Sequence, residues 1–399
     1  MRLNILQAQQ LLQQHQIDAW ILYSFRLSNP FIVSLLDPPP DVHITRRWIF
    51  CIPANEPPIK IIHRIDASAF QWLPTDEIHY TTQLEWEETL QWLAQRYPRI
   101  VTEYSPHNTL PAVSAVDAGV LELLRAGNPS IEIGSSADLL QYFTARWSTE
   151  QIEENRQTAQ HLRTIILNAF RWVKEQLAEH TVTEYDVQRW ILEQFDRLAL
   201  TTDHPPIVAT TLNAADPHYI PTTERHSPIK QGDLLLIDAW AKARTPDATY
   251  ADLTWMGYIG ESIPEQYAKV FTMLTEARDA AIHLLADRYR ENQPVYGYEL
   301  DDAARTVIEE AGYGKFFIHR TGHNIYTEVH GPGANLDNYE THDYRRILPA
   351  TSFSIEPGIY IPGEFGMRTE IDIVIAPDNV IHIFSEPIQQ RILPIFGNQ

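Results

Sequence analysis

Acidic residues interrupt apolar segments at four places in the second half of this 399-residue chain. Asp238 directly follows the apolar run 234–237, and Asp252 lies in the next strand-like segment. Glu356 and Glu370 lie in two further segments where a β pattern calls for apolar residues. Burying a carboxylate is costly unless a cation or hydrogen-bond donors compensate its charge. Four unrelated salt bridges would need four basic partners, and only Arg368 is evident there, so the pattern predicts a cation site.

The charge of this acidic set predicts the number of cations. Residues 242–249 read as a hairpin, which would bring Asp238 and Asp252 together, and their repulsion calls for a cation. Four carboxylates carry four negative charges, which two divalent ions balance. Residues 319–330 contribute three histidines, which alone favour a metal only modestly. Acid-rich ligation with one imidazole suits Mn²⁺, Co²⁺ or Zn²⁺.

The length predicts two domains. The first part, residues 1–147, alternates strand-like and helix-like segments and is expected to be a smaller α/β domain. Its predicted strands are 17–23, 47–52, 59–63, 100–104 and 131–133, with helices at 85–97 and 116–125. A boundary is predicted near Arg146–Thr149.

The second part, residues 148–399, is predicted to be an α+β domain in which helices cover a curved antiparallel sheet. Ser148 and Gln151 fit a capping box that opens a long helix, and a second helix follows Thr183. Further helices are predicted at 264–289 and 299–311. The predicted strands are 207–211, 234–241, 250–259, 352–361, 367–375 and 380–384.

Composition excludes several classes of protein. The net charge of −21 disfavours nucleic acid as a partner, because phosphate backbones are bound by basic patches. The single cysteine, Cys51, excludes an internal disulfide and a cysteine metal cage, and it reads as a buried structural thiol. No apolar run approaches the ~20 residues of a membrane span. The first residues lack the pattern of a signal peptide, so we expect a cytoplasmic protein.

The order Asp, Asp, Gly-His, Glu-Pro-Gly, Arg-x-Glu resembles that of the pita-bread metallopeptidases, which include methionine aminopeptidase, aminopeptidase P and prolidase. The resemblance spans about Ser148 to the C-terminus. The leading 147 residues resemble the N-terminal domain of the prolidase, aminopeptidase P and creatinase branch, which methionine aminopeptidases usually lack.

This resemblance implies five metal ligands. Asp238 would chelate one ion, and Asp252 and Glu370 would bridge both. His323 and Glu356 would hold the other ion. Glu356 would also shuttle a proton to the leaving nitrogen.

Four further residues receive roles from the same resemblance. His218 and His330 would contact the substrate, and His319 and His330 would steady the scissile carbonyl and the developing tetrahedral intermediate. Arg368 would orient a carboxylate ligand. Three features depart from the family pattern, namely Trp255, Tyr326 and the long polar segment 331–346.

The implied function is hydrolysis of the Xaa-Pro bond in short peptides with proline at the second position. An Xaa-Pro dipeptidase (prolidase) acting as a homodimer with two Mn²⁺ ions is expected, and an aminopeptidase P acting on longer peptides is the alternative. Retention of all five ligands argues against a metal-free creatinase-like amidinohydrolase and against a non-catalytic pita-bread binding module.

A dipeptidase must also recognise the free carboxylate of the C-terminal proline, usually with a fixed cation. Prolidases place an arginine between the last outer histidine and the Glu-Pro-Gly strand. In this sequence that position falls near His342, with Arg345 and Arg346 just after it. The opposing interpretation is that both arginines are solvated loop charges.

Overall fold

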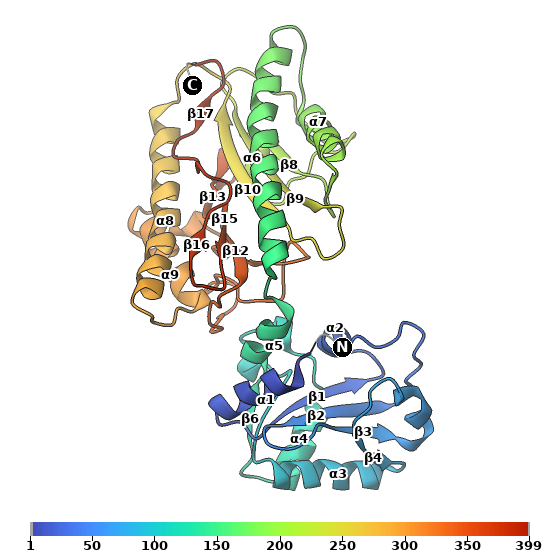
Figure 1. The fold of residues 1–399 in the computed structure, drawn as a ribbon. Helices are drawn as coiled ribbons and strands as arrows, with labels where there is room; N and C mark the ends of the chain where they lie inside the picture. The colour runs from blue at the N-terminus through green and yellow to red at the C-terminus, as the bar shows by residue number, and fades with distance from the viewer. Residues whose placement is uncertain (1–2, 398–399) are drawn as a thin grey trace. The chain divides into compact units, whose positions relative to one another are not determined.

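The computed structural model describes residues 3–397 and divides into two compact units, Met1–Thr144 and Ala145–Gln399 (Figure 1). The division falls at residue 144, where the sequence suggested 147. Trp147 belongs to the second unit because its backbone N–H donates to the Ala350 carbonyl at 2.6 Å. Its indole Nε1 also donates to the Ile325 carbonyl at 3.0 Å.

The first unit is the expected α/β domain, built on a six-stranded mixed sheet of order β4-β3-β2-β1-β5-β6. Apolar side chains of β1 pack on α3 and α4, which lie on one side of the sheet (Figure 1). Sequence reasoning missed α2, α5 and β4, because elements this short show little periodicity. The bounds are α1 Ile5–Gln14, β1 Ala19–Phe25, α2 Pro30–Leu36, β2 Arg47–Pro53, β3 Ile59–His63, β4 Asp76–Tyr80, α3 Gln83–Arg96, β5 Arg99–Thr102, α4 Ala118–Gly127, β6 Glu132–Ser135 and α5 Ala137–Thr144.

A buried carboxylate in this unit, Glu103, is compensated by protein donors alone. Trp20 Nε1, Asn29 Nδ2 and Ser136 Oγ donate to it at 2.9, 3.0 and 3.0 Å. Burial nevertheless raises the pKa of Glu103 to about 7. A buried acid is therefore not in itself evidence of a metal site. What distinguishes a metal site is whether protein donors satisfy the carboxylate oxygens.

The second unit contains a five-stranded sheet, a four-stranded sheet and a two-stranded hairpin. The five-stranded sheet comprises β7 Leu200–Thr201, β8 Ile207–Thr210, β9 Leu234–Ala243, β10 Ala251–Tyr258 and β17 Leu393–Pro394. The four-stranded sheet comprises β11 Asn324–Ile325, β12 Thr351–Ile355, β15 Ile371–Ile375 and β16 Ile381–His382, and the hairpin pairs β13 Gly358–Ile361 with β14 Phe365–Arg368. The helices are α6 Thr149–Leu177, α7 Glu184–Arg197, α8 Glu265–Arg290 and α9 Gly297–Glu310. Short 3-10 turns are η1 Arg64–Phe70, η2 Pro106–Asn108, η3 Pro111–Val113, η4 Asn213–Ala215 and η5 Gly314–Phe316.

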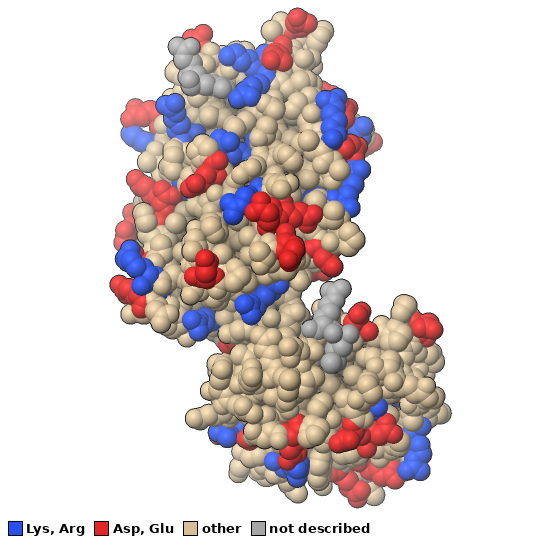
Figure 2. Space-filling view, in the orientation of Figure 1, with Lys and Arg blue, Asp and Glu red and all other residues tan. Residues whose placement is uncertain are grey.

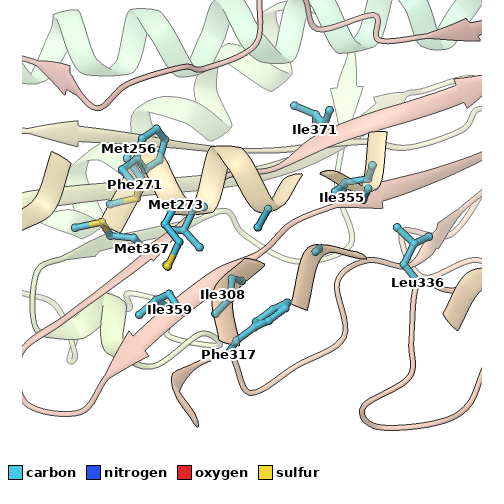
Figure 3. Close-up of a cluster of buried hydrophobic side chains, with 14 of the residues drawn as sticks. Met256, Phe271, Met273, Ile308, Phe317, Leu336, Ile355, Ile359, Met367 and Ile371 are labelled. Atoms are coloured by element: carbon cyan, nitrogen blue, oxygen red, sulfur yellow. The ribbon is translucent and has the colours of Figure 1, made fainter. Parts of the chain in front are cut away.

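Two hydrophobic cores share strand β9. Leu235 and Ile237 pack with α6 and α7, whereas Leu234 and Leu236 belong to the core formed with α8 and α9. Figure 3 shows the latter core, in which Phe271 and Met273 of α8 lie near Met256 and Met367. Both faces of β9 are buried, which explains the continuous apolar run before Asp238.

The predicted capping box of α6 is present. Ser148 Oγ accepts from the Gln151 backbone N–H at 3.2 Å, and Gln151 Oε1 accepts from the Ser148 N–H at 2.8 Å.

Acidic and basic side chains are interspersed on the face of the molecule drawn in Figure 2. Within residues 3–397, no helix has both the length and the apolar composition needed to cross a membrane.

Candidate metal centre

Two aspartates converge because β9 and β10 are antiparallel neighbours. Asp238 pairs with Thr254, and Asp252 pairs with Trp240. Asp252 and Thr254 are two residues apart and share a face, so Asp238 and Asp252 are diagonal neighbours on that face. This geometry supports the predicted hairpin.

Two glutamates meet where strands break. The sequence suggested that Glu356 and Glu370 lie inside continuous strands, but β12 ends at Ile355 and β15 begins at Ile371. Ile355 pairs with Ile371, so the residues just beyond this pair, Glu356 and Glu370, face each other across the break. The Glu370 backbone N–H donates to the Thr254 carbonyl at 3.3 Å, which brings Glu370 to the face carrying the aspartates.

His323 enters the cluster from the segment before β11. Its backbone N–H donates to Ser354 Oγ at 3.0 Å, and its carbonyl accepts from the Ser354 N–H at 2.9 Å. Its ring Nε2 lies 3.7 Å from Asp252 Oδ2 and 3.4 Å from Glu356 Oε1.

The electrostatics of this cluster are unfavourable without a cation. Burial and the charges on Glu370 and Asp238 hold the pKa of Asp252 well above its usual range. Burial and the charges on Glu356 and Asp238 do the same to the pKa of Glu370. Burial raises the pKa of Glu356 to about 7 and lowers the pKa of His323, which keeps the ring neutral and able to bind a metal.

The donor set fits divalent ions. Asp238 Oδ1 and Asp252 Oδ1 are buried and have no hydrogen-bond partner among residues 3–397, in contrast to Glu103 of the first unit. Ligand atoms of Asp252, His323 and Glu370 all lie within 4.8 Å of one another. Buried carboxylates with unpaired oxygens beside a neutral imidazole are suitable ligands for Mn²⁺, Co²⁺ or Zn²⁺.

Arg368 holds the carboxylates from one side. Its NH2 group contacts Asp238 Oδ2, its NH1 donates to Tyr360 Oη at 2.8 Å, and its Nε donates to Thr254 Oγ1 at 3.0 Å. Thr254 Oγ1 in turn donates to Glu370 Oε2 at 2.6 Å. Through these contacts Arg368 can orient Asp238, and its positioning role stays a prediction.

His319 has protein partners at both ring nitrogens. Nδ1 lies 2.7 Å from the Arg320 carbonyl and must donate to it, so Nε2 accepts from Tyr360 Oη at 2.9 Å. Burial lowers the pKa of His319 to about 3, so the ring is neutral. The expectation was that His319 steadies the scissile carbonyl, but these contacts make it a positioning residue that orients Tyr360 and, through it, Arg368.

A pocket of about 590 Å³ opens onto the cluster, which is within the usual size range of ligand sites. All five predicted ligands line it. So do Arg368 and the three outer histidines, His218, His319 and His330. The His330 ring packs edge-on against the His323 ring, with centroids 4.4 Å apart.

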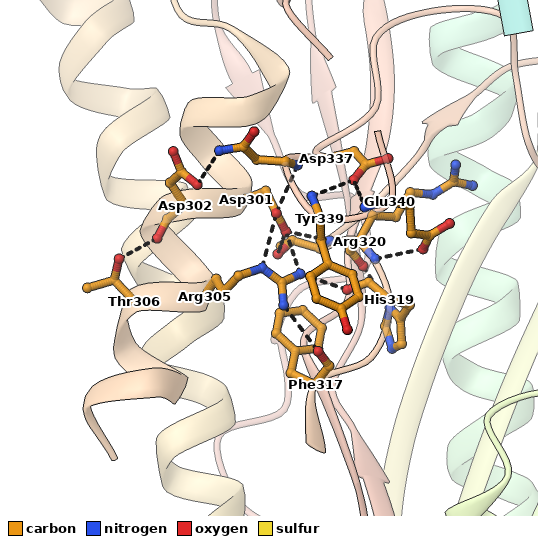
Figure 4. A network of polar contacts seen from close by, with 12 residues as sticks. Asp301, Asp302, Arg305, Thr306, Phe317, His319, Arg320, Asp337, Tyr339 and Glu340 are labelled. Carbon is orange, nitrogen blue, oxygen red and sulfur yellow. Dashed lines mark hydrogen bonds and ion pairs between the residues drawn. The ribbon is translucent and has the colours of Figure 1, made fainter. Parts of the chain in front are cut away.

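A buried ion pair holds the segment that carries His319, Arg320 and His323 (Figure 4). Asp301 of α9 accepts from the Thr321 N–H at 2.9 Å and pairs with Arg305 at 3.1 Å. Arg305 NH2 also donates to the His319 carbonyl at 2.8 Å. Helix α9 thereby fixes the backbone on both sides of Arg320.

Glu184 at the start of α7 holds the loop that carries His218. Its buried carboxylate accepts five donors, namely Thr210 N (2.6 Å), Thr210 Oγ1 (2.7 Å), Asn213 Nδ2 (2.9 Å), Tyr219 Oη (2.6 Å) and Ser227 N (2.7 Å). Tyr219 adjoins His218, so Glu184 sets the position of that histidine at the pocket.

We expect Glu184→Gln to lower kcat/KM by about tenfold. This is the smaller of the losses that are typical when a residue that only orients a functional side chain is replaced. Metal affinity measured by calorimetry should be unchanged, because Glu184 does not contact the cluster. The double variant with His218→Ala should be hardly worse than His218→Ala alone. Additive losses would contradict a role exerted through His218.

The structure does not bring His342, Arg345 or Arg346 to the pocket. Arg345 is buried in a double contact with Asp343, at 2.9 and 2.6 Å, and also donates to the Pro332 carbonyl at 2.7 Å. His342 is exposed and its ring lies tilted against that of Tyr298, with ring centroids 4.7 Å apart. The prediction that this loop binds the substrate carboxylate is therefore wrong, because Arg345 holds the loop itself together.

The departures from the family pattern lie mostly outside the pocket. Trp255 points to the core formed with α6 and α7, on the face of β10 opposite Asp252 and Thr254. Tyr326 packs against the same core. From the segment 331–346, Glu340 lines the pocket.

Sequence reasoning missed Arg320, Glu340, Tyr360 and Asp372. Asp372 is a buried acid within β15 whose Oδ2 accepts the Asp252 N–H at 2.7 Å. It shows the same anomaly, an acid where the strand pattern calls for an apolar residue, that identified Glu370. Arg320 carried a different signal, since it lies between two histidines assigned to the site.

The helix-covered sheets are those of the pita-bread fold, and they carry an acid-rich pocket whose residues suit divalent metal ions. The sequence matches the model of metallopeptidase family M24 over residues 153–377, more than half of the chain. The chain belongs to this family.

Named relatives agree with this assignment. The chain is 30% identical over 189 residues to the probable dipeptidase PepE of Mycobacterium tuberculosis, covering 47% of this chain and 46% of that protein. It is 32% identical over 189 residues to an Xaa-Pro dipeptidase of Lactobacillus helveticus, covering 47% of each. Each match spans about half the length of the relative. The solved structure of dipeptidase PepE from Mycobacterium ulcerans shares the fold, with a TM-score of 0.62, 19% identity, and coverage of 98% of this chain and 96% of that one.

Proposed function

We propose that this protein is an Xaa-Pro dipeptidase that binds two divalent metal ions, with Mn²⁺ as the working metal. The proposal rests on the convergence of Asp238, Asp252, His323, Glu356 and Glu370 at one pocket. Within residues 3–397, the buried oxygens Asp238 Oδ1 and Asp252 Oδ1 have no hydrogen-bond donor. The relative named as an Xaa-Pro dipeptidase supports the substrate class. A cytoplasmic homodimer is part of the same proposal.

The chemistry of the proposed reaction divides between the ions and the protein. When bound, the ions polarise a carbonyl and lower the pKa of water. Glu356 lines the pocket, where its carboxylate is suited to accept a proton and to deliver it to the leaving nitrogen. His330 and His218 line the pocket where they can donate to the peptide. Arg368 keeps Asp238 oriented.

Proline suits such a site. An Xaa-Pro amide has no N–H and a rigid ring, so enzymes that hold substrates by strand-type hydrogen bonds handle it poorly. A pocket that acts on the carbonyl does not depend on that missing donor.

Aminopeptidase P activity on longer peptides is the second candidate, because the same scaffold resembles both enzymes. Hydrolysis of Ala-Pro, Ala-Pro-Ala and a Met-Ala peptide, with and without Mn²⁺, separates the alternatives. We expect Ala-Pro to be cleaved fastest and only with metal. Preference for Ala-Pro-Ala would indicate an aminopeptidase, and preference for Met-Ala would contradict proline specificity altogether.

A further inference from the structure

Two arginines line the pocket, and they differ in how their guanidinium groups are used. Arg368 has contacts to Asp238, Tyr360 and Thr254, so its donors are committed. The Arg320 guanidinium has no hydrogen bond or ion pair within the part of the chain that the structure describes. Arg320 therefore presents a cation with free donors at the pocket that contains the acidic cluster.

The backbone of Arg320 is held firmly although its side chain is not. Glu340 Oε1 accepts its N–H at 2.9 Å, and its carbonyl accepts His319 Nδ1 at 2.7 Å. The adjacent residues are bound to the Asp301–Arg305 pair, and Figure 4 shows the Arg320 side chain extending away from that pair. A fixed backbone limits the entropy lost when the guanidinium engages a ligand.

Arg320 faces the same pocket as the proposed metal ligands Glu356 and Glu370. Its guanidinium therefore lies at the site where a substrate carbonyl would be attacked, and a negative group of the substrate could reach it there.

We propose that Arg320 binds the free C-terminal carboxylate of the substrate and thereby selects dipeptides. This inference rests on the proposed function and assigns to Arg320 the task that the loop at 342–346 does not perform. In an Xaa-Pro dipeptide the carboxylate is two bonds from the leaving nitrogen, so it must lie in the same pocket as the scissile carbonyl. A guanidinium binds a carboxylate through two parallel hydrogen bonds.

The test compares Ala-Pro with its amide, Ala-Pro-NH2, in the Mn²⁺-loaded 399-residue chain. Arg320→Gln should raise KM for Ala-Pro by about 10- to 100-fold, the loss expected for a charge-assisted hydrogen bond, and leave Ala-Pro-NH2 within about twofold. Arg320→Lys should recover part of the affinity, because it keeps the charge and loses the fork. Inhibition by free proline should weaken in Arg320→Gln, and inhibition by prolinamide should not.

Lys315→Gln is the matched control, since Lys315 is an exposed cation five positions earlier in the chain and removing it changes the net charge equally. It should leave both substrates unaffected. Equal losses on the free and amidated peptides in Arg320→Gln, or no loss on either, would overturn the inference while leaving Xaa-Pro cleavage intact. A selective loss in Arg346→Gln instead would return the carboxylate site to the loop.

Failure of the proposed function has a different signature, in which the wild-type protein cleaves neither peptide. Binding of uncleaved Ala-Pro, measured by calorimetry in wild type and Arg320→Gln, then decides the role of Arg320 alone. Equal binding by the two proteins, or none by wild type, would overturn it.

Discussion

Replacing Glu370 with alanine is expected to lower turnover by at least about 100-fold, because even residues that only orient metal ligands contribute 10- to 100-fold. Glu370 meets Glu356 at the strand break and receives a hydrogen bond from Thr254 at 2.6 Å. As the proposed bridge between two ions, it has no substitute in the cluster. Steady-state kinetics on Ala-Pro and metal analysis of the purified variant measure the effect, and we expect fewer than two ions per chain.

The same variant should remain folded. Burial and neighbouring negative charges disfavour ionised Glu370 in the metal-free protein, so the repulsion relieved by its loss offsets part of the cost of leaving the Thr254 hydroxyl without its acceptor. Thermal unfolding in chelator should therefore remain cooperative and lie within about 5 °C of the wild-type temperature. Glu153→Ala is the control, because Glu153 is exposed on α6 and pairs with Arg156 at the surface. Near-normal turnover of Glu370→Ala would show that Glu370 is not a metal ligand.

Removing the metals is expected to abolish turnover and to make stability decrease as pH rises above about 6.5. Burial and mutual repulsion raise the pKa values of Asp252, Glu370 and Glu356, the last to about 7. Such an acid has a higher pKa in the folded chain than in the unfolded chain. Its contribution to stability is fully present below the unfolded-state pKa and is lost as pH rises through the folded-state pKa. The folded chain then binds more protons than the unfolded chain.

The decrease in stability begins near pH 6.5 because the histidines oppose it at lower pH. Burial lowers the pKa values of His323 and His319, so below about 6.5 their protonation in the unfolded chain opposes the effect of the acids. Above that pH both histidines are neutral in either state. Each carboxyl group that stays protonated in the folded chain then lowers the free energy of unfolding by about 1.4 kcal/mol per pH unit.

Unfolding should be followed at pH 6.5 and 8.5, in chelator and with Mn²⁺. Since the chain has two compact units, the relevant transition is the one that Mn²⁺ shifts. In chelator its free energy of unfolding should fall by at least about 2 kcal/mol between the two pH values. With Mn²⁺ it should rise, because metal binding requires deprotonated ligands. A chelated protein that kept full turnover would contradict the metal centre as a whole.

The sequence by itself determined the class of the site. Acids placed in apolar strands cannot be buried without compensation, so Asp238, Asp252, Glu356 and Glu370 together indicated a cation site, and their order indicated the family. Periodicity also indicated the long helices and the α/β character of the first unit. These features depend on local pattern and on the cost of burying charge, which hold whatever the rest of the chain does.

Only the tertiary structure decided which polar groups are free. Arg345 and Arg320 look alike in sequence, yet Asp343 neutralises the first and no described side chain pairs with the second. His319 likewise resembled a substrate-binding histidine until Tyr360 and the Arg320 carbonyl were found at its two nitrogens. A hydrogen bond of this kind depends on which distant segments come into contact. A local sequence pattern does not predict those contacts, because it does not define the register of the loops. The physical reason is that pairing is a property of the fold, whereas the cost of an unpaired charge is a property of the residue.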